Sequence, residues 1–270
     1  MNLILLSPWD LGIAAALVCL LAALSWMLRL GIGRQLVVAA ARSTVQLMIL
    51  GMILKTLFAQ TSLWLIATMT AVMLAVAGYE VMARQQRRFR GGWGYGLGTL
   101  SMFLSSFTIT LLALTVVIQV DPWYQPQYLI PLLGMLLGNT MSGIAIALDN
   151  LTRNTWEQRH AIEARLMLGH EWQQAIAGIR RDALRSGLIP IINAMTTAGI
   201  VSLPGMMTGQ ILGGSPPLEA AKYQLLILFL IAAGSGLGSL TAIWAGSRRL
   251  FDERQRLRLD RLTNRKGASD

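Results

Sequence analysis

Polar side chains lie within long apolar stretches of this sequence, and they are the groups best placed for chemistry. Glu80 lies near the end of one such stretch, and Gln46 and Asn139 lie within two others. Ionisable and amide groups are costly in hydrocarbon and usually face an ion or substrate path. Glu80 is also close to a stretch boundary, where a structural ion pair or a side chain reaching to the surface explains it equally well.

A second set of polar groups lies in the segment 187–212, which is rich in glycine and proline. These residues break membrane helices, and the freed backbone groups must then face protein or water. Interrupted helices often line transport paths, although a kinked structural helix explains each single residue as well. We predict a transport path formed by Gln46, Glu80, Asn139, Asn193, Thr196, Ser202, Pro204, Met206 and Met207.

The sequence identifies no metal-coordinating residues. Fourteen methionines are present, and thioether sulfur suits soft ions such as Cu(I), whereas iron(II) or aluminium prefers oxygen and nitrogen ligands. Methionine is also an ordinary residue of apolar cores. Its abundance therefore does not predict a metal site.

Motifs of soluble enzymes are absent. None of the three lysines follows a glycine, so there is no G-x-x-x-x-G-K-[ST] phosphate loop, and there is no H-E-x-x-H or C-x-x-C. Both histidines, His160 and His170, lie in one polar segment. We expect a protein that is not an enzyme, whose energy comes from a partner.

The composition indicates an all-α polytopic membrane protein. Of its 270 residues, 54% are hydrophobic and only 13% are charged, and runs of about 20 apolar residues recur, each long enough to cross a bilayer. The fourth and fifth predicted spans are rich in glycine and other small residues, and Gly134 and Gly138 form a G-x-x-x-G that favours close helix packing. Seven spans are expected, at about 9–28, 36–58, 63–83, 97–120, 128–148, 187–212 and 223–246.

The net charge of +10 follows from membrane topology and does not indicate nucleic acid binding. With the N-terminus outside, all of the 23 Lys and Arg residues except Lys55 and Lys222 fall on the cytoplasmic side, as the positive-inside rule requires. We expect one transmembrane domain over 1–248 and a basic, frayed cytoplasmic tail over 249–270.

The segment of about 150–186 is the one long polar interruption, and its composition is helical. Its apolar residues recur at helical spacing, at Leu168, Trp172, Ala175, Ile176 and Ile179. One continuous helix of this length would span about 50–60 Å, so we expect it to bend at Gly169. A cytoplasmic helix with an apolar stripe is typical of a docking element.

The residues from Glu163 to Gly169, followed after nine residues by Ile179, resemble the E-A-A-x-x-x-G-x9-I loop of ABC-transporter permeases. This sequence departs from the loop at Arg165, where a second alanine is usual, and at Arg181-Asp182, where Leu-Pro often follows. In those permeases the loop docks into the nucleotide-binding subunit. The resemblance implies that this chain couples to an ATPase through Glu163, Ala164, Gly169, Trp172 and Ile179.

A closer resemblance, strongest over about 131–224, is to the Fet family of iron-export permeases. It rests on Ile130–Met135 with Gly138-Asn139, on Arg185–Pro190, on the unusual block Val201–Gly209 and on Glu219–Gln224. The family also resembles plant membrane subunits linked to aluminium tolerance. The first hundred residues resemble the family in their pattern of residue types more than in their exact sequence.

This resemblance implies a permease of the bacterial inner membrane, and the charge distribution places its N-terminus outside and its C-terminus in the cytoplasm. It would act as a homodimer with a separate ABC ATPase of the Fet type. The chain itself would bind no cofactor, the partner would use ATP, and iron would be the substrate. Alternatives are another metal or a nucleotide sugar as substrate, an ion-coupled carrier that uses Glu80, an intramembrane enzyme, and a sensor or scaffold without flux.

Overall fold

The computed structural model describes residues 7–59 and 62–264. The described chain is almost entirely helical and forms two compact units. The first comprises Met1–Ser62 with Leu212–Gly214, and the second comprises Leu63–Ile211 with Ser215–Asp270. The all-α class predicted for the chain is confirmed.

The first unit is a hairpin of two apolar helices, α1 (Pro8–Met27) and α2 (Gly33–Ala59). Helix α1 begins with a capping box, in which Asp10 N–H bonds the Ser7 hydroxyl and Ser7 N–H donates to the Asp10 carboxylate at 2.8 Å. The two helices approach closely at Gly33, where a Cβ atom would lie 2.9 Å from the carbonyl oxygen of Ala22.

The second unit begins with α3 (Leu63–Arg84) and the short strand β1 (Arg87–Phe89). The next span contains α4 (Trp93–Met102) and α5 (Thr108–Leu112), each followed by a π-helical turn, at Phe103–Phe107 and Ala113–Val117. The two longest helices are α6 (Pro126–Glu157) and α11 (Pro217–Arg249).

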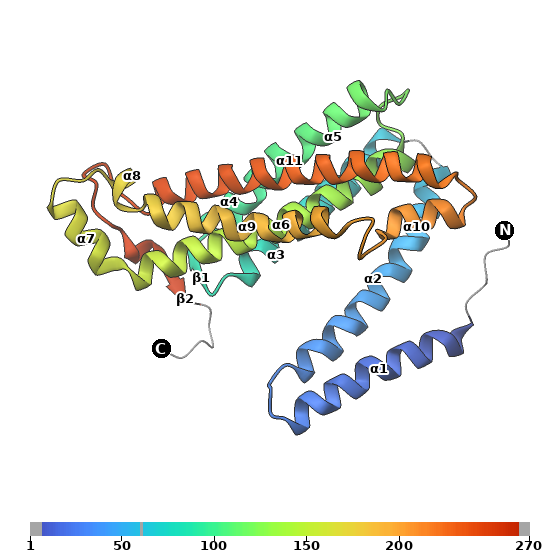
Figure 1. The fold of residues 1–270 in the computed structure, drawn as a ribbon, viewed down its shortest axis with the longest axis horizontal. Coiled ribbons are helices and arrows are strands. Elements are labelled where there is room, and N and C mark those ends of the chain that lie inside the picture. Colours follow the sequence, from blue (N-terminus) through green and yellow to red (C-terminus); the bar gives the residue numbers. More distant parts are fainter. Residues whose placement is uncertain (1–6, 60–61, 265–270) are drawn as a thin grey trace. The chain divides into compact units, whose positions relative to one another are not determined.

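Helices α6, α11 and α9 (Ala177–Thr197) run side by side and form the centre of this unit (Figure 1). Glycine permits close contact between α6 and α9, because a Cβ at Gly187 would lie 2.7 Å from the carbonyl oxygen of Gly143. The predicted G-x-x-x-G does not make this contact: a Cβ at Gly138 would meet nothing within 4 Å, and one at Gly134 would meet only Met73. The packing glycines of α6 therefore include Gly143, one turn further along.

Six helices of the described chain, rather than the expected seven, are long and apolar enough to cross a membrane. The predicted span 187–212 is not continuous. Helix α9 ends at Thr197, Ala198 is extended and Gly199 has a φ of +83°. The chain becomes helical again only in α10 (Gly205–Leu212), directly after Pro204. The interruption predicted from glycine and proline is thus confirmed, although Pro190 lies within α9 without ending it.

The expectation of one long, bent helix over 150–186 is wrong. Helix α6 ends at Glu157 and is followed by α7 (Arg159–Met167), α8 (Trp172–Ala175) and α9, so that the segment folds back on itself (Figure 1). The expected bend at Gly169 is present, with a φ of +88°. Residues 168–171 are not helical, and the left-handed conformation of Gly169 reverses the direction of the chain there.

The segment after α11 has defined structure as far as Asn264. The expectation of a frayed tail is therefore wrong for these residues. Leu259–Arg261 forms a short 3-10 helix, and β2 (Leu262–Asn264) pairs antiparallel with β1. The expectation for 265–270 lies outside the described residues. The tail thereby connects the end of α11 to the segment between α3 and α4.

Candidate functional site

The turn after α7 has the hydrogen bonds of a Schellman motif. Gly169 N–H donates to Leu166 O at 3.0 Å, and His170 N–H donates to Arg165 O at 3.2 Å. This arrangement places the residue after the helix cap in the left-handed region, which glycine adopts without a Cβ penalty. The φ of Gly169 is +88°. The glycine of the predicted coupling motif is therefore required by the backbone of the turn.

Two large apolar side chains project from this turn into solvent. Met167 is 82% exposed and Leu168 is 79% exposed. Glu163 and Ala164 are exposed on the same helix, α7. Neighbouring exposed apolar side chains outside the membrane spans mark a surface that suits a protein partner.

The remainder of the predicted apolar stripe faces inward. Ala175 and Ile176 are fully buried, and Ile179 is 4% exposed. These side chains hold α8 and the start of α9 against the protein, so a partner cannot reach them. The interpretation of the whole stripe as a docking surface is wrong for these three residues, because the fold-back turns them toward the chain's own core.

Arg165, the departure from the usual alanine, joins the two sides of the turn. Its Nη1 donates to the carbonyl oxygen of Ala175 at 2.9 Å. Ala175 is the last residue of α8, and basic side chains commonly satisfy the free carbonyls at helix ends. The side chain thus stabilises the fold-back.

The segment after α11, here called the tail, contacts the turn through Trp172. The indole ring of Trp172 stacks on Phe251 at a centroid distance of 5.4 Å. Its backbone N–H donates to Gln255 Oε1 at 3.0 Å, and the Arg180 guanidinium lies 6.0 Å from the ring. Trp172 is therefore an internal contact between the turn and the tail.

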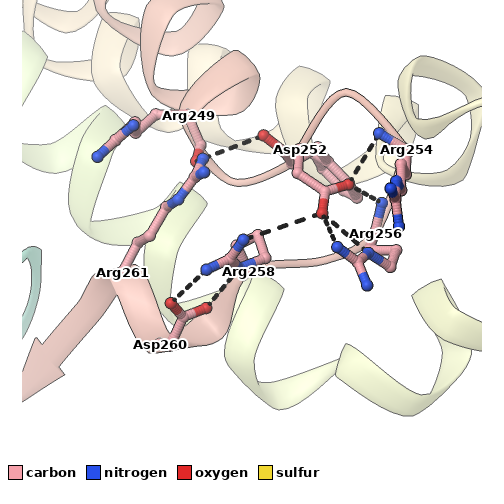
Figure 2. Close-up of polar contacts among 8 residues, drawn as sticks. Arg249, Asp252, Arg254, Arg256, Arg258, Asp260 and Arg261 are labelled. Atoms are coloured by element: carbon pink, nitrogen blue, oxygen red, sulfur yellow. Dashed lines mark hydrogen bonds and ion pairs between the residues drawn. The ribbon is translucent and has the colours of Figure 1, made fainter.

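The tail has its own polar framework (Figure 2). Asp252 accepts the N–H groups of Arg254 and Arg256 at 3.0 and 2.8 Å, and Arg256 Nε donates to it at 2.9 Å. Arg258 makes two bonds of 2.9 Å to Asp260. Arg261 donates to the carbonyl oxygens of Arg249 and Phe251 at 2.7 and 3.1 Å, which caps the end of α11.

These bonds lower the pKa values of the Asp252 and Asp260 carboxyl groups. For Asp252 the main cause is the backbone hydrogen bond from Arg256. For Asp260 it is the side-chain hydrogen bond from Arg258. Both act because a hydrogen bond to the charged form of a carboxyl group favours that form. At neutral pH the framework is fully ionised.

A groove of about 660 Å³ separates the turn from the tail. The turn contributes Glu163, Leu166, Met167, Gly169, His170 and Glu171, and the tail contributes Arg254, Gln255, Arg256 and Leu257. Sequence analysis missed the tail residues. Their signal is local: Asp252 precedes two arginines whose N–H groups it can accept, a pattern typical of an Asx-type turn.

The residues predicted to line a transport path are spread over several elements. Gln46 lies on α2 in the first unit, Glu80 on α3, Asn139 on α6, and Asn193 and Thr196 on α9. Ser202 and Pro204 lie in the break, followed on α10 by Met206 and Met207. The path stays a prediction.

Several of these polar groups have a partner close by in sequence. Asn139 Nδ2 donates to Met135 O at 2.8 Å, and Thr196 Oγ1 donates to Ile192 O at 2.8 Å. The Arg84 guanidinium lies 3.9 Å from the Glu80 carboxylate. Among the described residues, no group of three or more His, Cys, Asp or Glu side chains is arranged to hold a metal ion.

The six apolar spans and the helical fold define a multi-pass α-helical membrane protein. Residues 8–251 match the model of the uncharacterised protein family UPF0014, to which this chain belongs. It is 39% identical over 249 residues to a UPF0014 membrane protein of Synechocystis sp., with 92% of this chain and 94% of the relative covered.

Two other relatives have descriptive names. The chain is 34% identical to the protein ALUMINUM SENSITIVE 3 of Arabidopsis thaliana, with 86% of this chain and 83% of the relative covered. It is 29% identical to the probable iron export permease protein FetB of Escherichia coli strain K12, with 92% and 93% covered. No solved structure matches the chain.

Proposed function

We propose that this protein is the permease subunit of an ABC exporter and that a separate ATPase of the Fet type docks on the turn between α7 and α8. The observation that carries the proposal is the exposed apolar tip, Met167 and Leu168, beside a glycine turn whose sequence resembles the ABC coupling loop. Glu163, Ala164 and Gly169 flank this tip and would complete the contact surface. Ile179 and Trp172 would support it from within.

Iron is the proposed substrate. The proposal is supported by the relative in Escherichia coli that is named a probable iron export permease and whose length the chain covers almost completely. Another metal or a nucleotide sugar is the alternative substrate. In either case this chain would bind no nucleotide, and ATP would be used by the partner.

The proposed mechanism is alternating access driven from the turn. Closure of two ATPase subunits would displace the tip of α7. Helix α9 runs from this region to the break at 198–204, and the tail connects Trp172 to the end of α11. A displacement at the turn would therefore reach the central helices α9 and α11 directly.

The proposed topology places the N-terminus outside, the C-terminus in the cytoplasm, and the protein in the bacterial inner membrane. It requires an odd number of crossings, so the interrupted segment of α9 and α10 would form a seventh crossing beside the six continuous spans. Its support is that the segment after α3, the end of α6 and the tail meet at one end of the second unit. Gln86 N–H donates to Asp149, Thr152 donates to Arg87 O, and β1 pairs with β2. We further propose that two copies of the chain form the complete membrane path.

Docking is tested by replacing both tip residues with glutamate, as Met167→Glu with Leu168→Glu. Because apolar anchors at an interface each contribute about 1–2 kcal/mol, we expect co-purification of the ATPase to fall at least about tenfold. The matched control is Gln173→Glu with Gln174→Glu, which adds the same charge to exposed positions of α8. Undiminished ATPase binding by the tip variant would refute the docking assignment.

A further inference from the structure

Arginine and tryptophan side chains gather where α11 ends and α4 begins. Trp93 and Trp244 are 52% and 55% exposed. The Arg249 guanidinium lies 4.4 Å from the centre of the Trp93 ring, and that of Arg248 lies 5.8 Å from the centre of the Trp244 ring. Both helices belong to membrane-crossing segments. The four side chains lie at one end of these two segments, where a span would meet the headgroup level.

These side chains line a cavity of about 1020 Å³. Its charged residues are Arg248, Arg249, Arg254, Arg256 and Arg261, with Asp252 and Glu253. Asp252 already accepts hydrogen bonds from the tail arginines. A smaller adjoining cavity of about 460 Å³ adds Arg90 and Arg258 and contains one acidic residue, Asp260. The combined site is strongly cationic and has aromatic walls.

Within the described chain several cations of this site form no ion pair, and Arg248 and Arg249 are the two that lie over the tryptophan rings. Neither forms an ion pair within the described chain, whereas Arg256 and Arg258 are paired with Asp252 and Asp260. The guanidinium of Arg249 lies away from both carboxylates (Figure 2). It also experiences the like charges of Arg261 and Arg258, which the opposite charge of Asp260 offsets only in part. A bound anion would relieve this repulsion.

We propose that this cavity, lined by Trp93, Trp244, Arg248 and Arg249, binds the phosphate headgroup of an anionic phospholipid from the cytoplasmic leaflet. A lipid fits better than a soluble anion because the aromatic walls belong to membrane spans, and tryptophan concentrates at the headgroup level. Basic pockets at the cytoplasmic ends of spans are typical headgroup sites. The site does not depend on what the protein transports.

The site has a structural connection to the turn. Phe251, which lines the cavity, also stacks on Trp172. Arg261 lines both cavities and caps α11. A lipid bound here would therefore hold the end of α11 and the tail in the arrangement that supports the turn.

The test uses the full-length protein purified and inserted in vesicles of phosphatidylcholine, either alone or with phosphatidylglycerol. Lipid retained after mild detergent extraction is quantified by native mass spectrometry. We expect enrichment of phosphatidylglycerol over phosphatidylcholine. Since each arginine near an anionic surface contributes a factor of about five, Arg249→Gln should reduce this enrichment about fivefold, and Arg248→Gln with Arg249→Gln about thirtyfold.

The control is Arg181→Gln with Arg185→Gln, which removes the same charge from exposed positions of α9 and should leave the enrichment unchanged. Arg248→Lys with Arg249→Lys, which keeps the charge, should restore most of it. Addition of inorganic phosphate should compete weakly, because it lacks acyl chains.

Three results would overturn the proposal. One is equal retention of the two lipids by the unmodified protein. Another is displacement of phosphatidylglycerol by inorganic phosphate at millimolar concentration, which would identify a soluble anion as the ligand. The third is unchanged lipid enrichment in the double glutamine variant together with weaker ATPase binding, which would assign the arginines to an acidic protein partner.

Discussion

At the scale of single residues, Gly169 shows how one backbone conformation shapes the proposed site. Its φ of +88° is accessible to glycine and costs other residues about 1–2 kcal/mol. The space around it is open, since a Cβ would meet no atom within 4 Å. The requirement for glycine is therefore conformational and not steric.

Replacing Gly169 with alanine should lower the stability of the turn by about 1–2 kcal/mol and weaken ATPase binding. The membrane spans should be unaffected, because the change is confined to the turn between α7 and α8. Thermal unfolding of the purified protein and ATPase co-purification measure the two effects. Gly178→Ala is the control, since Gly178 lies in α9 with open space around it and alanine favours a helix. Equal behaviour of the two variants would contradict the role of the turn.

The carboxyl group of Asp252 makes the tail sensitive to acid. Its pKa is lower in the folded chain than the ordinary value of 3.8, chiefly through the hydrogen bond from Arg256 N–H. A lowered pKa means that the stabilisation is fully present above the unfolded value and is lost as the pH falls through the folded value. The tail should therefore be anchored at neutral pH and loosen below about pH 4.

Hydrogen exchange at the amides of Arg254 and Arg256 measures this effect. At neutral pH both amides should exchange more slowly in the unmodified protein than in Asp252→Asn. The ratio of the two rates should approach one as the pH falls below about 4. A ratio that stays constant over this range would show that the ionised carboxylate does not hold the tail.

At the scale of elements, close packing of α6 against α9 depends on Gly143 and Gly187. A Cβ at Gly143 would lie 3.0 Å from Gly187 O, so alanine there would force the helices apart at a cost of about 1–3 kcal/mol. Gly143→Ala should reduce thermal stability and the yield of folded protein. Gly138→Ala, on the same helix with open space around it, should reduce neither. Normal stability of Gly143→Ala would show that the helices separate without cost.

The break between α9 and α10 is the element with the most direct proposed role in transport. Pro204 precedes α10 and its carbonyl accepts Thr208 N–H at 3.1 Å. Pro204→Ala should permit helix over the break and should reduce ATP-driven flux several-fold more than it reduces expression. Pro190→Ala, within the continuous part of α9, serves as the control. Normal flux through Pro204→Ala would make the break purely structural.

Much of the fold could be predicted because membrane spans are local features. A run of about 20 apolar residues identifies a span from sequence alone. Gly169 marked one turn, and the glycines and prolines of 187–212 marked the break after α9. The fold-back of α7 and α8 could not be predicted in the same way. It depends on contacts between residues distant in sequence, such as Trp172 with Gln255 and Phe251. Helical periodicity placed Ile176 and Leu168 on one stripe, but only tertiary packing separates the buried residue from the exposed one.

At the scale of the whole molecule, the proposed docking turn, the tail and the central helices α9 and α11 form one connected structure in the second unit. The turn is anchored by Arg165 and by Trp172, and the tail is anchored by β1 and by the cap on α11. This connection supports a permease whose membrane helices respond to an ATPase outside the membrane.

The most direct test of this account is ATP hydrolysis and metal movement in liposomes that contain the protein with the proposed Fet-type ATPase. Iron(II) is compared with other divalent ions and with a nucleotide sugar. We predict that iron(II) stimulates hydrolysis and moves in the ATP-driven direction, and that Met167→Glu with Leu168→Glu removes both effects. Hydrolysis that iron(II) does not change would contradict the proposed substrate, and failure of any ATPase to associate with the protein would contradict the account as a whole.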